Sequence, residues 1–203
     1  MSRCVASRNP MKKSTFWQRL NQPRLPAGYQ AGITLNRLER DLLPYPSQRI
    51  TPTELVISLD NQLTVSVTEQ VKVLFLAFIV NTRFSVRGAL STSLDARIEL
   101  KTTGVLRQKK IKWISHQPVG QQIIAQFSAY PVITQTLEQL DFTSVNLEIK
   151  QGNWHCEITP FTASELVSRL PASRRYLRLT PEQRHRLLSA LQLVSQLMNK
   201  LSL

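Results

Sequence analysis

The chain has 203 residues, of which 42% are hydrophobic and 19% charged, so it can form a sizeable core and is too apolar for a disordered protein. Its 26 Lys and Arg residues against 13 Asp and Glu give a net charge of +13, and a field of that size attracts polyanions and anionic surfaces. Two cysteines argue against a disulfide framework, and the longest apolar run, Val73 to Val80, is too short to cross a bilayer as a helix, which needs about 20 residues.

The positive charge is concentrated at the two ends of the chain. Residues 1–53 hold nine Lys and Arg against two Asp and Glu, and residues 171–203 hold six against one. Residues 121–170 have the opposite balance, with two against five. The N-terminal segment lacks the apolar stretch of a secretory signal. We therefore expect a cytoplasmic protein with a basic, partly flexible leader, residues 1–27, and a single domain, residues 28–203.

The first element that the sequence predicts is a short helix from Thr34 to Leu43. Leu35, Leu38 and Leu42 recur at helical spacing, which places them on one face. Pro44 follows directly and cannot continue a helix. The remaining residues before the first strand are rich in proline and are expected to be ordered coil.

From Glu54 onward apolar residues alternate with polar ones, which is the period of a strand. A three-residue turn at residues 60–62 would form a hairpin with Ile57 opposite Val65. The run Val71 to Val80 is apolar at both odd and even positions. Such a run is typical of a central strand that is covered on both faces, so we expect one strand here.

A second hairpin is predicted around Gly104, between Arg97–Lys101 and Val105–Ile114. Two helices follow, Val119–Ala129 and a helix from Pro131 to Leu140, because proline is favoured at the first helical position.

The third hairpin has a two-residue loop, Gln151-Gly152. This loop predicts three pairs on one face of the hairpin: Ile149 with Trp154, Leu147 with Cys156, and Val145 with Ile158.

The last element is a helix with a complete set of start signals. Thr180 is suited to the N-cap, Pro181 to the first helical position, and Gln183 to a capping box. Its apolar residues form a stripe at helical spacing: Leu187, Leu188, Leu191, Val194, Leu197, Met198 and Leu201. The order of elements predicts an α+β fold, a largely antiparallel β-sheet covered by helices, with this amphipathic helix packed on the sheet.

The strongest candidate site is a group of arginines near the C-terminal end. Arg169, Arg174 and Arg178 accompany Tyr176, and guanidinium groups bind phosphates and carboxylates through paired N–H donors. Tyr176 could stack on a base or donate from its hydroxyl group. The alternative is a strand whose arginines are solvated or form surface ion pairs.

In a strand from Arg174 to Leu179, alternation would place Arg175 on the same face as two leucines. We therefore expect Arg175 to be buried and paired with Glu165 or Glu157, and Arg175→Ala to lower thermal stability. The other arginines and Tyr176 would be exposed together on the opposite face.

Two further groups mix cations with aromatic residues. A secondary basic patch could follow a phosphate backbone or lie at lipid headgroups, although lysines on a solvated edge strand would also discourage aggregation. This patch consists of Arg107, Lys109, Lys110, Lys112 and Trp113. The leader group could lie at a membrane interface or dock on its own domain. It consists of Lys12, Lys13, Phe16, Trp17, Arg19 and Leu20.

The sequence carries no recognisable catalytic or cofactor motif. No Gly-x-Ser-x-Gly and no glycine-rich phosphate loop occurs, and the three histidines lack the spacing of metal ligands, so we expect no metal and no cofactor. Acid–base catalysis would have to use a few local candidates if two of them converged in a cleft. These are Glu148, Glu157, Glu165 and His155.

Several segments together resemble a family of uncharacterised bacterial proteins, a "domain of unknown function" family. The resemblance covers about residues 28–195 and implies no activity, cofactor or partner. The segments that carry it are Gly32–Leu42, Thr82–Phe84, Leu140–Phe142, Trp154, Ser164–Val167 and Arg169–Gln183.

The sequence does not identify a biochemical activity or an oligomeric state. The charge distribution favours a non-enzymatic binding or accessory protein that contacts an anionic partner, namely nucleic acid, an anionic membrane surface or an acidic protein. The alternative is a small apolar ligand held in a pocket between the sheet and the last helix, since Val71–Val80 is more apolar than one packed face requires.

Overall fold

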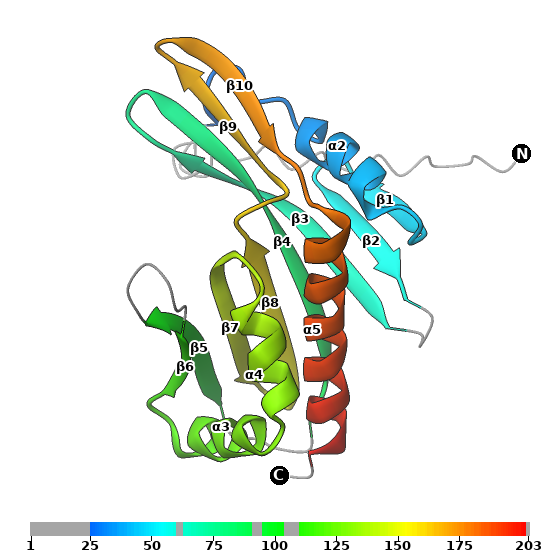
Figure 1. Cartoon of the computed structure of the whole chain (residues 1–203), viewed down its shortest axis with the longest axis vertical. Coiled ribbons are helices and arrows are strands. Elements are labelled where there is room, and N and C mark those ends of the chain that lie inside the picture. The colour runs from blue at the N-terminus through cyan, green and yellow to red at the C-terminus, as the bar shows by residue number, and fades with distance from the viewer. Residues whose placement is uncertain (1–24, 60–62, 91–94, 104–109, 202–203) are drawn as a thin grey trace, which may run out of the picture.

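The computed structural model of the chain describes residues 25–59, 63–90, 95–103 and 110–201. These residues form an antiparallel sheet with helices packed on one of its faces (Figure 1). The helices are α2 (Ile33–Leu42), α3 (Pro118–Ala129), α4 (Pro131–Glu138) and α5 (Pro181–Lys200). The strands are β1 (Ser47–Thr51), β2 (Glu54–Ser58), β3 (Thr64–Val73), β4 (Ala77–Ala89), β5 (Ala96–Thr103), β6 (Lys110–Ser115), β7 (Phe142–Lys150), β8 (Asn153–Pro160), β9 (Ser164–Arg169) and β10 (Ala172–Leu177).

The sheet divides at the long strand β4. Its first residues, Ala77–Val80, pair with β9, and its last residues, Phe84–Ala89, pair with β8. Between them the Thr82 hydroxyl donates to the Ala163 carbonyl, 2.8 Å away, where the chain turns from β8 into β9. One half of the sheet therefore contains β1 to β4 with β9 and β10, and the other continues from β4 through β8, β7, β5 and β6 (Figure 1).

Strand alternation decides which face of the sheet the helices cover. Along β4 the even-numbered side chains, from Phe78 to Val86, are buried, and the odd-numbered ones up to Ser85 are half-buried. Helix α5 packs against β4 and β8, α3 packs against β5 and β6, and α2 lies against β4 at the end of the sheet that carries β9 and β10. No helix in the described part of the chain is long and apolar enough to cross a membrane.

Most of the predicted elements are confirmed. The three pairs of the third hairpin occur as expected, from Ile149 opposite Trp154 to Val145 opposite Ile158. The loop residues Gln151 and Gly152 have φ of 50° and 73°, as a tight two-residue turn requires. Ile57 lies opposite Val65, and β5 pairs with β6, although the turn at residues 60–62 and Gly104 lie outside the described residues.

Helix α5 begins as predicted, but Gln183 acts differently from a capping box. The Thr180 hydroxyl accepts from the Gln183 backbone N–H at 3.3 Å. The Gln183 side chain does not return to the cap: its amide donates to the Gln139 carbonyl and its oxygen accepts from the Asp141 N–H. Gln183 therefore ties the start of α5 to the segment between α4 and β7. The predicted apolar stripe is buried from Leu187 to Met198.

The prediction of one strand over Val71–Val80 is wrong. This run forms a hairpin in which Val73 pairs with Phe78 and the Leu74 N–H donates to the Ala77 carbonyl at 2.8 Å. Phe78 is buried, whereas Phe75 in the turn is 92% exposed. The apolar character of the run therefore comes from an exposed turn between two strands, and it does not indicate a strand covered on both faces.

Candidate functional site

Helix α2 is held at its start by a carboxylate from the sheet. Its N-cap residue, Gly32, has no side chain to satisfy the first N–H groups. Glu69 of β3 replaces it: Oε2 accepts from the Gly32 N–H at 3.0 Å, and Oε1 accepts from the Leu35 N–H at 3.1 Å. Oε2 also accepts from the Tyr29 hydroxyl at 2.8 Å. A negative charge at this end is favourable because it opposes the helix dipole.

The other end of α2 carries a buried aspartate, which accepts hydrogen bonds from β10 and from the residues that follow it. The side chain of Asp41 is 7% exposed. Oδ2 accepts from the Tyr176 hydroxyl at 2.9 Å and from the Leu179 N–H at 3.1 Å, and Oδ1 accepts from Nε of Arg178 at 2.9 Å. The Asp41 carbonyl accepts from Arg184 of α5 at 2.6 Å. Asp41 therefore joins α2 to β10 and α5.

A third carboxylate, Glu165 of β9, lies beneath α2 and is 2% exposed. Arg37 Nη1 lies 2.9 Å from its Oε1, without hydrogen-bond alignment, so the contact is an ion pair. The Thr34 hydroxyl is 3.3 Å from Oε2, and Arg174 Nε is 3.9 Å from Oε1. Arg174 also donates to the Gly28 carbonyl at 2.7 Å. A buried carboxylate with two arginines beside it leaves a local excess of positive charge.

Tyr176 completes this arrangement. The Arg37 guanidinium lies over its ring, 5.8 Å from the centroid. Burial raises the pKa of Tyr176 well above its ordinary value, and the neighbouring Asp41 raises it further. The Tyr176 hydroxyl is therefore a neutral donor that is committed to Asp41.

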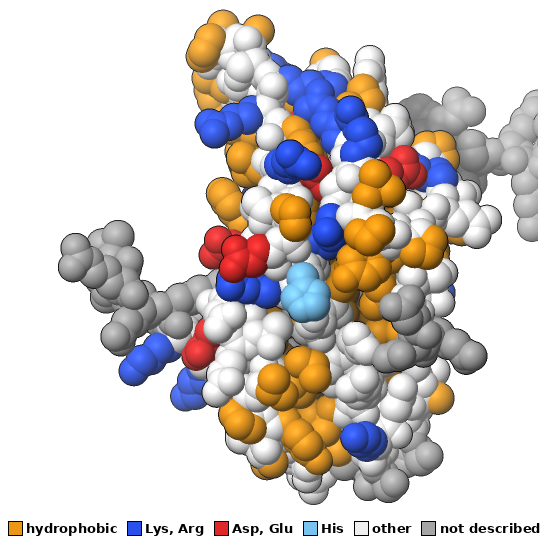
Figure 2. All heavy atoms as spheres, turned by 45° about the vertical axis from the view of Figure 1, so that its right-hand side comes forward, with side chains coloured by type: hydrophobic (Ala, Val, Ile, Leu, Met, Phe, Trp, Pro, Cys, Tyr) orange, Lys and Arg blue, Asp and Glu red, His pale blue; other side chains and the backbone are white. Residues whose placement is uncertain are grey.

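The structure brings three of the four predicted site residues together and adds two that the sequence analysis missed. Arg174 and Tyr176 lie on the side of β10 that faces α2, and Arg178 follows the strand and contacts Asp41 of α2. Helix α2 contributes Arg37 and Arg40. Figure 2 shows Lys and Arg side chains gathered over this part of the molecule. We call these four arginines the α2–β10 arginine surface: Arg37, Arg40, Arg174 and Arg178. The fourth predicted residue, Arg169, lies apart, at the end of β9.

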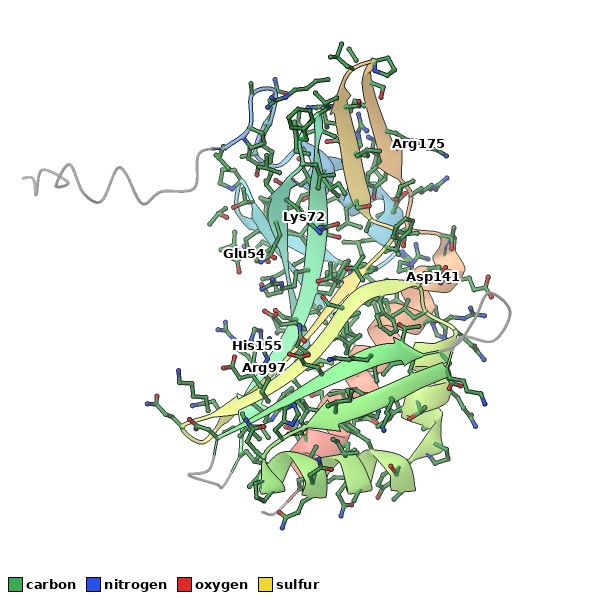
Figure 3. The ribbon with its side chains drawn as sticks, turned by 90° about the vertical axis from the view of Figure 1, so that its left-hand side faces the viewer. Glu54, Lys72, Arg97, Asp141, His155 and Arg175 are labelled. Carbon is green, nitrogen blue, oxygen red and sulfur yellow. The ribbon has the colours of Figure 1, made fainter. Side chains whose placement is uncertain are left out.

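The prediction of a buried Arg175 is wrong. Arg175 is exposed, and among the described residues it has no ion-pair partner (Figure 3). Its cross-strand neighbour is Leu166, which is also exposed, whereas the neighbour of Tyr176 is the buried Glu165. The two faces of β10 are therefore reversed relative to the prediction, because the strand ends at Leu177 and the leucine beyond it does not report on the strand's faces.

The secondary basic patch does not combine its cations with an exposed indole. The Trp113 ring is buried and stacks on Phe127, with 4.6 Å between centroids and 16° between planes. Lys112 precedes it on β6 and is exposed on the other face, as is Lys110 at the start of the strand. Arg107 and Lys109 lie outside the described residues.

The acid–base candidates converge in part at two cavities beside β4 and β8. Arg83, His155 and Glu157 line a cavity of about 650 Å³, and with Glu148 they line a neighbouring one of about 220 Å³. His155 Nδ1 is 3.8 Å from Glu157 Oε1, which is too far for a hydrogen bond, and Arg83 Nη1 is 3.0 Å from the same oxygen. Glu165 lies elsewhere, beneath α2. In the described part of the chain, no three His, Cys, Asp or Glu residues are placed to hold a metal ion.

The apolar-ligand hypothesis stays a prediction. The residues of α5 that face the sheet, such as Leu191 and Met198, are buried. The cavity that α5 helps to line, through Ser195 and Asn199, has mostly polar side chains. The apolar run that suggested a ligand pocket is explained by the exposed β3–β4 turn.

The chain belongs to the family described as "Protein of unknown function (DUF3156)", whose model matches residues 40–198. This finding confirms the resemblance drawn from the sequence segments. The match begins at Arg40 in the last turn of α2, includes every described strand and helices α3 and α4, and ends in the last turn of α5. No curated protein and no solved structure matches the chain.

The contacts on the two faces of β10 predict unequal losses of stability when they are removed. Asp41→Ala should lower the free energy of unfolding by roughly 3 kcal/mol, because it leaves the Tyr176 hydroxyl and the Leu179 N–H without their acceptor. Arg175→Ala should change it by no more than about 0.5 kcal/mol, as at other exposed sites. Urea unfolding of both variants measures the difference. A larger loss for Arg175→Ala than for Asp41→Ala would show that the faces are assigned wrongly.

The raised pKa of Tyr176 predicts a pH dependence. The unfolded chain releases the Tyr176 proton near pH 10, whereas the folded chain keeps it. The stability that this tyrosine contributes is therefore complete below about pH 10 and is lost as the pH rises above that value. Tyr176→Phe should be less stable than wild type at neutral pH, and the gap should narrow between about pH 9 and about pH 11. The urea midpoints of both proteins, measured across this pH range, test the prediction. A difference in stability that stays constant with pH would contradict it.

Proposed function

We propose that the protein is a non-enzymatic, cytoplasmic binding or accessory protein that contacts an anionic partner through the α2–β10 arginine surface. One observation carries the proposal: the carboxylates at this surface are buried, whereas guanidinium groups remain outside. Asp41 and Glu165 are 7% and 2% exposed, and Arg178 is 73% exposed. A partner would therefore meet the cations first.

The donors that stay available suit phosphate or carboxylate groups. Arg178 uses Nε for Asp41, so its terminal nitrogens are open to solvent. Arg40 is exposed in the last turn of α2 and has no ion-pair partner among the described residues. A guanidinium group can present two parallel N–H donors to such an anion.

The surface is also held in place before any partner arrives. Arg37 is fixed between Glu165 and the Tyr176 ring, and Arg174 is fixed by the Gly28 carbonyl. Side chains that are already ordered lose less conformational entropy on binding, so preorganisation favours affinity.

The one free cysteine of the described residues is compatible with the proposed compartment. Burial raises the pKa of the Cys156 thiol to about 12, so this free cysteine stays protonated and unreactive. A single buried thiol in the described part of the chain fits a reducing cytoplasm, where disulfides are rare.

Charge removal at this surface should weaken binding. We expect Arg40→Gln combined with Arg178→Gln to reduce affinity for an anionic probe. The slope of log affinity against log salt should also fall by about 1 for each phosphate that the variant no longer neutralises. The probes are heparin, a DNA duplex and phosphatidylserine vesicles, measured from about 50 to about 200 mM salt. The melting temperature of each variant is measured alongside.

The matched control removes two charges from another part of the sheet. Lys101 and Lys112 are cross-strand neighbours on β5 and β6. Lys101→Gln combined with Lys112→Gln should leave affinity nearly unchanged. Equal or greater loss in the control would assign the contact to β5 and β6, which carry Lys112 of the secondary basic patch. The absence of salt-dependent binding to all three probes would refute the proposed function.

A further inference from the structure

Two hairpin turns lie side by side at one end of the molecule (Figure 1). They are the β3–β4 turn, Phe75-Leu76, and the β9–β10 turn, Leu170-Pro171. The strands that lead to them are paired, and the Arg169 N–H donates to the Leu76 carbonyl at 2.8 Å. The large apolar side chains at this end are exposed, Phe75 to 92% and Leu170 to 72%. We call this group the apolar tip: Val73, Leu74, Phe75, Leu76, Leu170 and Pro171.

Turn geometry does not explain Phe75 and Leu76. Two-residue hairpin loops favour Gly, Asn and Asp, which adopt the required backbone angles easily. Phe75 and Leu76 have no such advantage, and their exposure forgoes the free energy that burying them would release. Contiguous exposed apolar side chains of this kind mark a surface that contacts a partner or a membrane.

The sequence on either side of the tip is cationic. Residues 70–78 and 166–179 together contain five Lys and Arg and no Asp or Glu. A row of cross-strand neighbours runs from Lys72 through Ile79 and Leu166 to Arg175. Lys72 and Arg175 therefore lie on the same face of the sheet, the one that the helices do not cover (Figure 3). Arg174 lies on the opposite face, towards α2. Positively charged side chains therefore lie next to the apolar tip on both faces of the sheet.

We propose that the apolar tip inserts into the interface of an anionic lipid bilayer, with these cations at the level of the lipid phosphates. The proposal rests on the proposed function and names its anionic partner as a membrane surface. Lys72 and Arg174 each lie three residues from a tip residue, Phe75 and Pro171, which is about 10 Å along a strand. Interfacial protein segments bury their apolar side about 5–10 Å into the headgroup region, so the spacing matches.

Charge complementarity favours a lipid surface over other occupants of the tip. A second copy of the chain would bring the same cations against one another. The residues before Leu25 are also cationic, with six Lys and Arg and no acid, so they have the same sign of charge as the cations beside the tip and complement the same anionic surface. The chain enters at this end, because Tyr29 packs edge-on against Phe78, with 6.4 Å between ring centroids. Anionic lipids attract such clusters.

The test compares two double variants of the full chain. Phe75→Ser with Leu170→Ser removes the most exposed apolar side chains of the tip. Phe161→Ser with Val132→Ser removes a phenylalanine and an aliphatic side chain that are also exposed but lie outside the tip. Each variant is tested for binding to phosphatidylcholine vesicles, to vesicles that also contain phosphatidylserine, and to heparin, and its melting temperature and size are measured.

The tip variant should bind phosphatidylserine vesicles at least about tenfold more weakly than wild type, since two large apolar side chains no longer enter the lipid. Its heparin binding should be unchanged, and the control variant should match wild type on every probe. Wild-type affinity for anionic vesicles should exceed that for neutral ones.

Other results overturn the inference and separate it from the proposed function. Equal vesicle binding by the tip variant and wild type would refute insertion. Wild-type binding to heparin but not to anionic vesicles would also refute it and leave the proposed function standing. Tip-dependent binding that is equal for neutral and anionic vesicles would support insertion and contradict an anionic partner. A wild-type dimer that the tip variant loses would assign the tip to self-association.

Discussion

Three carboxylates between α2 and the sheet hold one end of this protein together. Glu69 satisfies the first N–H groups of the helix, Asp41 joins its last turn to β10 and α5, and Glu165 lies beneath it. Asp41 and Glu165 are buried, and buried carboxylates are costly unless they are paired and hydrogen-bonded, so their partners must stay close. The same contacts fix Arg37, Arg174 and Tyr176. The stability of the part of the protein around α2 and the positions of its arginines therefore depend on the same network of carboxylates.

The sequence was sufficient to predict most of the fold because local signals agreed with long-range packing. The alternation of apolar and polar residues and the Gln-Gly loop predicted the register of β7 and β8. The helix-start signals at Thr180 and Pro181 predicted where α5 begins. The β3–β4 hairpin could not be predicted in this way, since its turn, Phe75-Leu76, has no turn-forming residue. A continuous apolar run then looks like one buried strand, although the structure leaves its middle exposed.

The candidate site was predictable only in part. Arg174, Tyr176 and Arg178 were found from composition, but which face they occupy depends on Glu165 and Asp41, which are distant in sequence. One local signal was available: Asp41 sits directly before Leu42 at the edge of the α2 apolar face, where a carboxylate requires a partner. Arg37 and Arg40 join the α2–β10 arginine surface because α2 packs beside β10. The periodicity of the sequence does not indicate which elements pack together.

Amide hydrogen exchange of Glu69→Gln tests the central claim, that sheet carboxylates hold α2 and its arginines in place. A glutamine has one acceptor oxygen, so either the Leu35 N–H or the Gly32 N–H and Tyr29 hydroxyl must lose their partner. Exchange should accelerate in α2 while the amides of β7 and β8 keep their wild-type rates, because local opening is confined to the element whose hydrogen bonds are removed. Unchanged exchange in α2, or equal acceleration in β7 and β8, would contradict the account.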